Sequence, residues 1–507
     1  MQIRKLWRPL KDNGVVCSPT ALQRASVVCL TFMLGIGITQ AAVAAELDVM
    51  GPQSDSVAGS VATPVADTSQ RAGSSQRLTI ESTNLESLLL EKGVITQDDW
   101  IRLKAEEERR AFEQTAETGM AGNPRWYERI RINGYTQFRY SAGANDKNFS
   151  IPLSDKSATS QPREFYFRRI RLVFQGQISE RLAFFLQGAF EGDQEQQNLF
   201  NKEIIDAYGD YYLTKDKVHR LRFGLQRTLN SFDTLRSSTN RQELDRHESV
   251  QSGAPGERDL GISYFWSPKI AQERFAQLAA YHNGPGDYGV FGVTVYNGQG
   301  RNAAELNGNK HIGVRLAYPF ELPNGRLLET GVMAYRGVFS VNGAGAPAST
   351  TSAALCPQGL NKQGGCDTTD ERVTAYVWTP PQPWGLLAEG TVGKNGKRNE
   401  TTNIIEEKPL IGGYVQGYYT WRYSDVGMLT PYVRYGEFHG GLKSLTGAAD
   451  GASRSWNFGL VWEPDTHWRY VAELMLKDGL NETLVRNQAQ NDFDGSLFRV
   501  QAQWFFN

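Results

Sequence analysis

From Arg131 to the C-terminus, apolar and polar side chains alternate with a period of two residues in one segment after another. Ile170 and Leu172 share one face of such a segment, and Arg169 and Arg171 share the other. This period is typical of β-strands that have one apolar side and one polar side. A single strand of this kind fits a soluble sandwich or a membrane barrel equally well. The same alternation recurs in residues 456–462, 468–477 and 498–506.

The lengths of the connections separate these two possibilities. Outer-membrane barrels have short periplasmic turns and long external loops, whereas a soluble sandwich has no reason to sort its loops in this way. Turn-forming residues and polar tracts alternate here: the short turns are at 179–180, 215–217, 322–325, 380–383, 424–426 and 464–466, and the long loops are at 143–162, 229–257, 340–370, 395–408, 439–452 and 478–495.

The sequence therefore predicts an all-β fold, a transmembrane antiparallel β-barrel of about 16 strands over residues 130–507, in a bacterial outer membrane. The segment 274–297 fits either one interrupted strand or two strands around an Asn-Gly-Pro-Gly turn. We count it as one because bacterial barrels have even strand numbers. The mean hydropathy of −0.46 agrees with a barrel, in which half of each strand faces a polar lumen.

The region before the barrel divides into three parts. Residues 1–45 resemble a signal peptide, because basic residues precede an apolar stretch at 25–38 and a small-residue cleavage site ending at Ala45. An uncleaved anchoring helix is the alternative. Residues 46–80 have the composition of a disordered linker. Residues 81–125 predict a short helical periplasmic segment, which fits an oligomerising coil or a solvated charged helix equally well.

Charge and motifs exclude several classes of function. Removal of residues 1–45 leaves a net charge of about −5, so no global positive charge recruits anions or nucleic acid. The sequence lacks Gly-x-Ser-x-Gly, His-Glu-x-x-His and phosphate-loop motifs, and its six His are scattered, so we expect no enzyme and no cofactor. Cys356 and Cys366 predict a disulfide, and their spacing is a poor metal pattern.

Five motifs along the chain resemble those of one family. They are the Arg-Arg-x-Arg-Leu strand at 165–172, Asp-Ala-Tyr-Gly-Asp-Tyr at 206–211, Arg-Phe-Gly-Leu-Gln-Arg at 222–227, Pro-Gly-Glu-Arg-Asp-Leu-Gly at 255–261 and Tyr-Asn-Gly-Gln-Gly at 296–300. Their order is similar to that of the phosphate-selective porin O/P family. The resemblance implies a homotrimeric, sixteen-stranded porin in outer-membrane lipid. It further implies that small anions, phosphate or polyphosphate among them, diffuse passively through an arginine-lined channel.

Arginines are the candidate selectivity residues, because their planar, permanently charged fork binds oxyanions through two hydrogen bonds. For each, the alternative is a wall arginine that is paired with an acid across the lumen. The loop 229–257 is the best candidate for a constriction, and a solvated surface loop is its alternative. The candidates are Arg139, Arg169, Arg171, Arg222, Arg227, Arg236, Arg241, Arg246, Arg258, Arg315 and Arg434.

Two other functions stay open at this level. Tyrosines on the inward parity would suit a porin for another solute such as carbohydrate, although packing or girdle positions explain them too. A structural or adhesive barrel, whose disulfide-closed loop at 356–366 binds a partner, is the third hypothesis. The tyrosines are Tyr135, Tyr208, Tyr212, Tyr414, Tyr418 and Tyr432.

Overall fold

A computed structural model describes most of the expected barrel. All the described residues belong to one compact unit, Ile80–Asn507. The predicted signal peptide, linker and helical segment of residues 81–125 lie outside them. The structure describes residues 129–144, 163–190, 203–253, 258–279, 281, 284–341, 356–399, 402, 404–423, 425–443, 448, 450–481 and 492–506.

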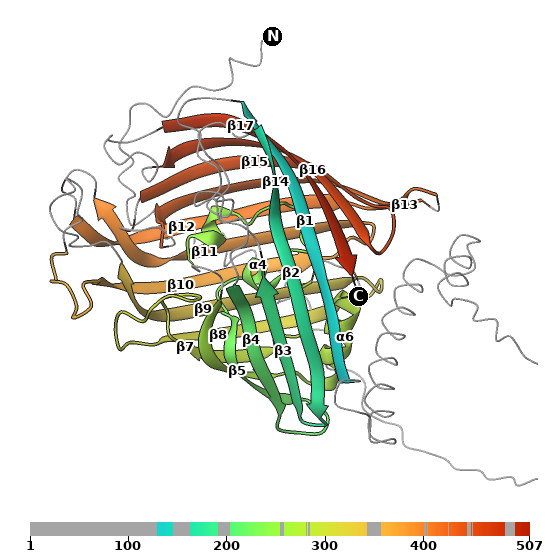
Figure 1. The fold of residues 1–507 in the computed structure, drawn as a ribbon, viewed down its shortest axis with the longest axis horizontal. Coiled ribbons are helices and arrows are strands. Elements are labelled where there is room, and N and C mark those ends of the chain that lie inside the picture. The colour runs from blue at the N-terminus through green and yellow to red at the C-terminus, as the bar shows by residue number, and fades with distance from the viewer. Residues whose placement is uncertain are drawn as a thin grey trace, which may run out of the picture. The chain divides into compact units, whose positions relative to one another are not determined.

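The described strands form a single antiparallel sheet that closes on itself, because the first strand pairs with both the second and the last (Figure 1). The strands are β1 (Ile130–Ala144), β2 (Arg163–Ser179), β3 (Leu182–Ala189), β4 (Glu203–Tyr212), β5 (His219–Arg227), β6 (Arg258–Trp266), β7 (Phe291–Tyr296), β8 (His311–Glu321), β9 (Leu327–Val341), β10 (Cys366–Thr379), β11 (Trp384–Asn399), β12 (Ile404–Tyr419), β13 (Trp421–Tyr423), β14 (Gly427–Gly441), β15 (Asp450–Glu463), β16 (Trp468–Asn481) and β17 (Asp492–Phe506).

The predicted number of strands is confirmed. The strands β12 and β13 are separated by Thr420 alone and pair in turn with the same neighbour, β14, so they form one strand position in the barrel wall. Every other described strand has its own position, which gives sixteen positions around the ring. None of the described helices is long and apolar enough to cross a membrane.

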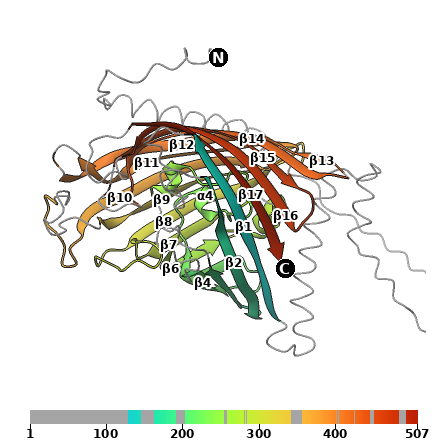
Figure 2. The ribbon, with the colours of Figure 1, turned by 45° about the horizontal axis from the view of Figure 1, so that its top comes forward.

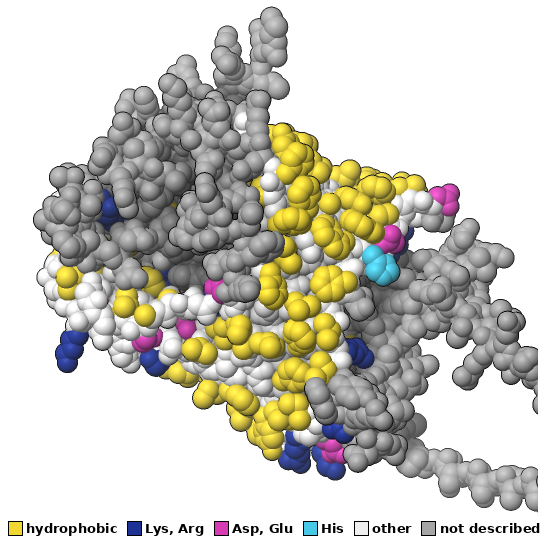
Figure 3. Space-filling model, in the orientation of Figure 1, with side chains coloured by type: hydrophobic (Ala, Val, Ile, Leu, Met, Phe, Trp, Pro, Cys, Tyr) yellow, Lys and Arg dark blue, Asp and Glu magenta, His cyan; other side chains and the backbone are white. Residues whose placement is uncertain are grey.

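The two-residue alternation sorts side chains between the lumen and the outside. On β8, Arg315 is fully buried inside the barrel, whereas its neighbour Leu316 is more than half exposed on the outer surface. The outer surface is largely apolar, as the yellow side chains over the strands in Figure 3 show. This division is what a lipid-facing wall around a polar lumen requires.

Short turns lie at one end of the barrel, which we call the short-turn end, and the longer loops lie at the other. One connection at the short-turn end is long. Residues 267–290 contain the helix α6 (Lys269–Ala279) and join β6 to β7. The prediction of one strand in 274–297 gave the correct strand count, but its first part is helical. Ala271, Phe275 and Leu278 recur at the three-to-four-residue spacing of a helix. The interpretation of residues 274–297 as an interrupted strand does not account for this spacing.

The predicted long loop at 395–408 is also wrong in extent. Strand β11 continues to Asn399 and β12 begins at Ile404, so the connection is four residues long. Pairs of opposite charge lie on this part of the wall, including Lys394 with Glu407 and Lys397 with Asp450. Lys394 and Glu407 pair between the neighbouring strands β11 and β12, and Lys397 reaches Asp450 of β15. A polar composition that suggested a loop therefore belongs to an extended wall.

The connection from β5 to β6 folds into the barrel. It contains the short helices α4 (Phe232–Leu235) and α5 (Glu248–Gln251), and α4 lies within the ring of strands in both views (Figures 1 and 2). Its apolar residues belong to the same buried cluster as inward-facing residues of β10, β12 and β14. The hypothesis that this loop is a solvated surface loop is therefore wrong for the described residues 228–253.

The outer wall supplies a first prediction. Val433 lies in the middle of β14 and points outward, so Val433→Lys should lower the free energy of unfolding in a lipid bilayer by about 2–4 kcal/mol. Denaturant titration of the refolded barrel measures this change. The control Val433→Leu should change it little. Equal stability of the Lys variant and the control would show that this face does not meet lipid.

Candidate anion pathway

The loop from β5 to β6 crosses the lumen and is held at both ends of α4. At the start of α4, Phe232 stacks on Tyr376 of β10, with 4.5 Å between ring centroids. The backbone N–H groups of Phe232 and Asp233 donate to the carboxylate of Glu389, at 3.2 and 3.3 Å. A carboxylate at a helix start satisfies N–H groups that have no partner within the helix.

Two predicted pathway arginines hold the other end of α4. Arg227 donates to the backbone carbonyls of Thr234 and Leu235, at 3.1 and 2.8 Å. Arg246 donates to the carbonyls of Asp233, at 2.8 Å, and Arg236, at 3.0 Å. Cations at a helix C-terminus satisfy its free carbonyls. The contacts of Arg227 and Arg246 therefore position the loop.

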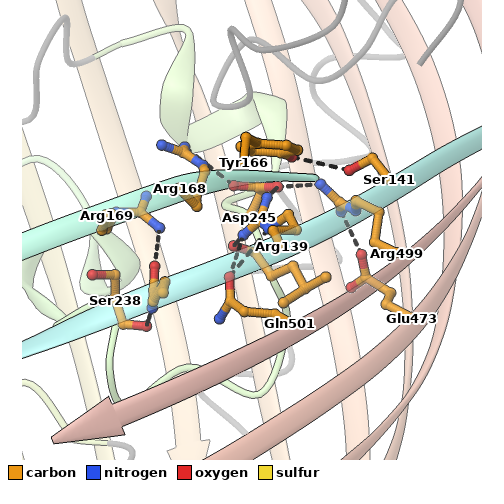
Figure 4. A network of polar contacts seen from close by, with 12 residues as sticks. Arg139, Ser141, Tyr166, Arg168, Arg169, Ser238, Asp245, Glu473, Arg499 and Gln501 are labelled. Atoms are coloured by element: carbon orange, nitrogen blue, oxygen red, sulfur yellow. Dashed lines mark hydrogen bonds and ion pairs between the residues drawn. The ribbon is translucent and has the colours of Figure 1, made fainter. Parts of the chain in front are cut away.

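Across the lumen from α4, the loop carries a fully buried carboxylate, Asp245. Arg139 of β1 donates to it at 3.0 Å, Arg168 of β2 at 3.4 Å, and Arg499 of β17 also pairs with it (Figure 4). Burial opposes the ionisation of Asp245, but these three guanidinium groups outweigh it and hold the pKa of this carboxyl well below its usual range. Asp245 therefore ties the loop to the wall formed by β1, β2 and β17.

A β-bulge explains how two consecutive arginines reach the lumen. On β2, Arg169 lies opposite Gln137 and Phe167 lies opposite Phe138, so Arg168 is an extra residue without a partner position. A bulge interrupts the alternation locally and redirects side chains. Arg168 thus reaches Asp245 while Arg169 also faces the interior, as Figure 4 shows.

Arg169 and Arg241 differ from Arg139, Arg168 and Arg499 because they form no ion pair with a described carboxylate. Arg169 donates to the side-chain oxygen of Gln137 at 2.9 Å, and Arg168, Arg171 and Arg241 repel its charge. Arg241 is buried, and two of its guanidinium nitrogens, Nε and Nη1, have no hydrogen-bond partner within the described part of the chain. Among the described residues, no carboxylate forms an ion pair with either arginine. Buried guanidinium groups in this state are competent to bind an oxyanion.

Other predicted arginines are paired across the wall. Arg222 forms two hydrogen bonds with Asp210, at 2.7 and 2.8 Å, and Arg258 forms two with Asp206, at 3.2 and 3.1 Å. These four residues come from three of the motifs identified in the sequence. The motifs therefore contribute a set of two-hydrogen-bond ion pairs that joins β4 to β5 and β6.

A fourth motif is joined to this set by a neighbouring acid. Asp259 accepts hydrogen bonds from the backbone N–H groups of Gly298, at 2.6 Å, and Gly300, at 3.1 Å. Both glycines have positive φ, and a Cβ at Gly298 would lie 1.9 Å from the ring of His311. Only glycine fits this turn, which explains the Asn-Gly-x-Gly pattern.

Comparison with known proteins agrees with this geometry. The family model described as phosphate-selective porin O and P matches residues 138–506. The chain belongs to this family. It is thus a porin of the bacterial outer membrane, a channel rather than an enzyme. No curated protein sequence matches it.

Several solved porin structures resemble this porin. OmpT of Vibrio cholerae, in a trimer form, has 10% identity and a TM-score of 0.43, over 74% of this chain and 99% of that one. The anion-selective porin from Comamonas acidovorans has 12% identity and a TM-score of 0.44, over 74% and 99%. OprB of Pseudomonas putida has 9% identity and a TM-score of 0.45, over 75% and 94%. At these identities the likeness concerns the barrel fold alone.

The remaining predicted arginines of the porin also lie inside the barrel. Arg315 pairs with Glu329 at 2.7 Å, and Arg236 pairs with Glu243 at 3.4 Å. Arg434 donates to the backbone carbonyl of Asp245 at 2.9 Å. Arg171 is buried on the same strand as Arg169. The structure thus gathers Arg139, Arg169, Arg171, Arg241 and Arg434 on one side and places Arg222, Arg227, Arg236, Arg246, Arg258 and Arg315 elsewhere, in structural contacts.

Sequence reasoning missed several arginines of the interior, including Arg372 of β10, which donates to the backbone carbonyl of Ser249 in the lumen loop at 3.1 Å. Arg499 and Arg469 share the inward parity of their strands, so the alternation that located the wall could have identified them. Arg469 donates to the backbone carbonyls of Thr239 and Arg241, at 2.7 Å each. Arg168 gives no such signal, because only the bulge turns it inward.

The inward tyrosines mainly support packing. Tyr432 donates to Glu473 at 2.6 Å, Tyr414 donates to Glu389 at 2.9 Å, and Tyr135 shares a hydrogen bond of 2.7 Å with Ser238. Their hydroxyl groups are engaged with the wall and the loop. No observation here favours a sugar track.

The predicted cysteine pair is bonded in the structure. Cys356 and Cys366 form a disulfide with an S–S distance of 2.12 Å, at the end of the barrel opposite the short turns. Cys366 packs with Val341 and Ile405 in a small apolar cluster. Among the described residues, no group of His, Cys, Asp and Glu is placed to hold a metal ion.

The ion pairs of Asp245 predict a characteristic pH dependence. Asp245→Asn should lower the thermal midpoint of the barrel at pH 7, because losing one partner of a buried pair costs about 3–5 kcal/mol. The pKa of Asp245 is lowered by folding, so its stabilisation is fully present above its unfolded value near 3.9 and is lost as the pH falls through the folded value. Circular dichroism should find a constant difference between wild type and variant from pH 8 to about pH 5. A difference that disappears by pH 6 would contradict the assignment.

Proposed function

We propose that this porin lets small anions, phosphate or polyphosphate in particular, diffuse passively through a passage lined by arginines of β1, β2, β14 and β17 and of the lumen loop. The observation that carries this proposal is the local excess of positive charge. Two buried carboxylates, Asp245 and Glu473, face a larger group of arginines, which comprises Arg139, Arg168, Arg169, Arg171, Arg241, Arg434 and Arg499.

The chemistry of this cluster favours oxyanions over simple halides. A guanidinium group offers two parallel N–H donors that match two oxygens of a phosphate. Arg241 keeps Nε and Nη1 without a hydrogen-bond partner among the described residues, and no carboxylate there forms an ion pair with Arg241 or with Arg169. The net charge of about −5 for the mature chain does not oppose this, because the charges that line a low-dielectric passage dominate the field within it.

The proposed homotrimer gains support from the unequal height of the wall. Strands β3 to β7 contain 6 to 10 residues each, whereas β14 to β17 contain 14 or 15. Six residues in a strand tilted by about 45° span about 14 Å of membrane, less than the apolar band of about 25 Å. A second copy of the chain would cover the short sector, and outer-membrane lipid would cover the tall one.

Planar bilayer recordings test anion selectivity. The wild type should give an anion-selective reversal potential in a salt gradient, and phosphate should block the chloride current. Arg169→Ala and Arg241→Ala should each weaken phosphate block by at least about tenfold, because one charge-assisted pair contributes about 1.5–3 kcal/mol. The matched control is Arg336→Ala, which removes an arginine that is 78% exposed on the outer wall.

Two results would contradict the proposal. A cation-selective wild-type current that phosphate does not block would exclude the anion passage. Equal phosphate block in the wild type, both lumen variants and the control would show that Arg169 and Arg241 do not line it.

The oligomeric state is a separate prediction. The porin extracted in mild detergent should have three times the mass of one chain by multi-angle light scattering. Phe223→Lys, on the outer face of the short strand β5, should shift it to monomers, because a desolvated charge without a partner opposes association. Val433→Arg, on the tall sector, should leave the wild-type mass unchanged. A wild-type mass of one chain would overturn the homotrimer.

A further inference from the structure

The connection 267–290 is far longer than the barrel needs at this position. Strands β6 and β7 are already paired at Phe265 with Gly292 and at Trp266 with Phe291. Val290 extends this pairing by donating its backbone N–H to Trp266, at 2.8 Å. A two-residue turn could close such a hairpin. The other described connections at the short-turn end are two to six residues long, so most of 267–290 is an insert.

The insert turns into the barrel. On helix α6, Ala271, Phe275 and Leu278 form one face, and each is at most 2% exposed. They belong to the buried cluster that also contains Phe232 of the lumen loop. The guanidinium group of Arg315, an inward-facing residue of β8, lies 5.9 Å from the ring of Phe275. Burial of this apolar face inside the wall stabilises the inward position.

The insert and the lumen loop meet at one side chain. Trp378 points inward from β10 and is 1% exposed. It packs against Phe232, with 5.4 Å between ring centroids. The same ring is also close to the backbone of the insert, since a Cβ at Gly284 would lie 2.9 Å from it. Two segments that enter from opposite ends of the barrel therefore pack against the same tryptophan.

Hydrogen bonds fix the C-terminal arm of the insert. Asp287 accepts a bond from Ser267 at 2.6 Å and another from the backbone of Gly289 at 2.8 Å. Arg220 of β5 donates to the carbonyl of Asp287 at 2.6 Å, and Arg315 donates to the carbonyl of Gly289. Both ends of the insert are thus joined to each other and to the inner wall. These contacts hold the insert against the wall.

The direct contacts of the insert and the arginine cluster involve different strands of the ring. The contacts of the insert described above are with β5, β6, β8 and β10, although its buried cluster continues to Tyr432, Val461 and Val471 of β14 to β16. The arginine cluster belongs to β1, β2, β14 and β17 and the loop. We infer that the α6 insert closes the β6–β10 sector at the short-turn end and thereby sets the size limit of the pore. It confines passage to the sector beside the arginine cluster. This inference does not depend on which ion is carried.

Removing the insert tests this role. A variant in which Asn-Gly replaces residues 268–289 should insert as a closed barrel, because the β6–β7 pairing keeps its register. Its single-channel conductance in potassium chloride should be at least about twofold above the wild-type value. Liposomes that contain it should admit uncharged tri- and tetrasaccharides faster than wild-type liposomes do. Neutral solutes separate this test from the proposed anion selectivity.

A second variant covers the case in which the deletion does not insert. Phe275→Ala combined with Leu278→Ala keeps the chain length and removes most of the packed face, so conductance should rise, though by less than in the deletion. The matched control is Glu273→Gln, which changes the exposed face of the same helix. Wild-type conductance and wild-type sugar uptake in an inserted deletion variant, or in the double variant, would overturn the inference.

Discussion

The interior of this porin depends on one buried carboxylate. Asp245 lies at the far side of the lumen loop and meets Arg139, Arg168 and Arg499 from three strands of the wall. Each of these guanidinium groups would be costly to bury alone, and so would the carboxylate. Their mutual compensation fixes where the loop can lie. The position of Arg241, four residues earlier in the same loop, follows from that constraint.

The contribution of such a cluster is geometric more than energetic. Replacing buried ion pairs by well-packed apolar groups often leaves stability unchanged or raises it. In a channel, however, an apolar lumen would exclude ions. The porin therefore places apolar packing on one side, around Phe232 and Trp378, and concentrates charge on the other. The same loop provides both surfaces, so its path across the lumen divides the interior into two chemically different sectors.

The family motifs have a structural explanation in the same terms. Asp206 and Asp210 pair with Arg258 and Arg222, and Asp259 binds the glycine-rich turn that follows β7. These contacts lie away from the cluster around Asp245. Among the motif arginines, only those of the Arg-Arg-x-Arg-Leu strand belong to that cluster. The family motifs therefore mainly explain how the barrel wall is held together. The proposed anion selectivity rests on the residues around the lumen loop.

Much of the wall was predictable because it depends on local order. Alternation along a strand decides which side chains face the lumen, and the lengths of most connections indicate which end of the barrel they occupy, with the exceptions of 267–290 and the short link from β11 to β12. Alternation and connection length are both local properties of the sequence. The strand count and the inward positions of Arg315 and Arg434 could therefore be predicted from it. The helix α6 was missed, and its segment was interpreted as a strand, because a short apolar repeat is ambiguous between the two periods.

By itself, the sequence determined a sixteen-stranded barrel with an apolar outside and an arginine-rich inside. Tertiary structure alone decided which arginines are engaged and which are available. Arg222 and Arg169 both face the lumen by the alternation of their strands, yet one has a carboxylate on the neighbouring strand and the other has Gln137. Partners of this kind are set by register, by the bulge at Arg168 and by the path of a loop. These features depend on contacts between residues far apart in the chain, which no local pattern records.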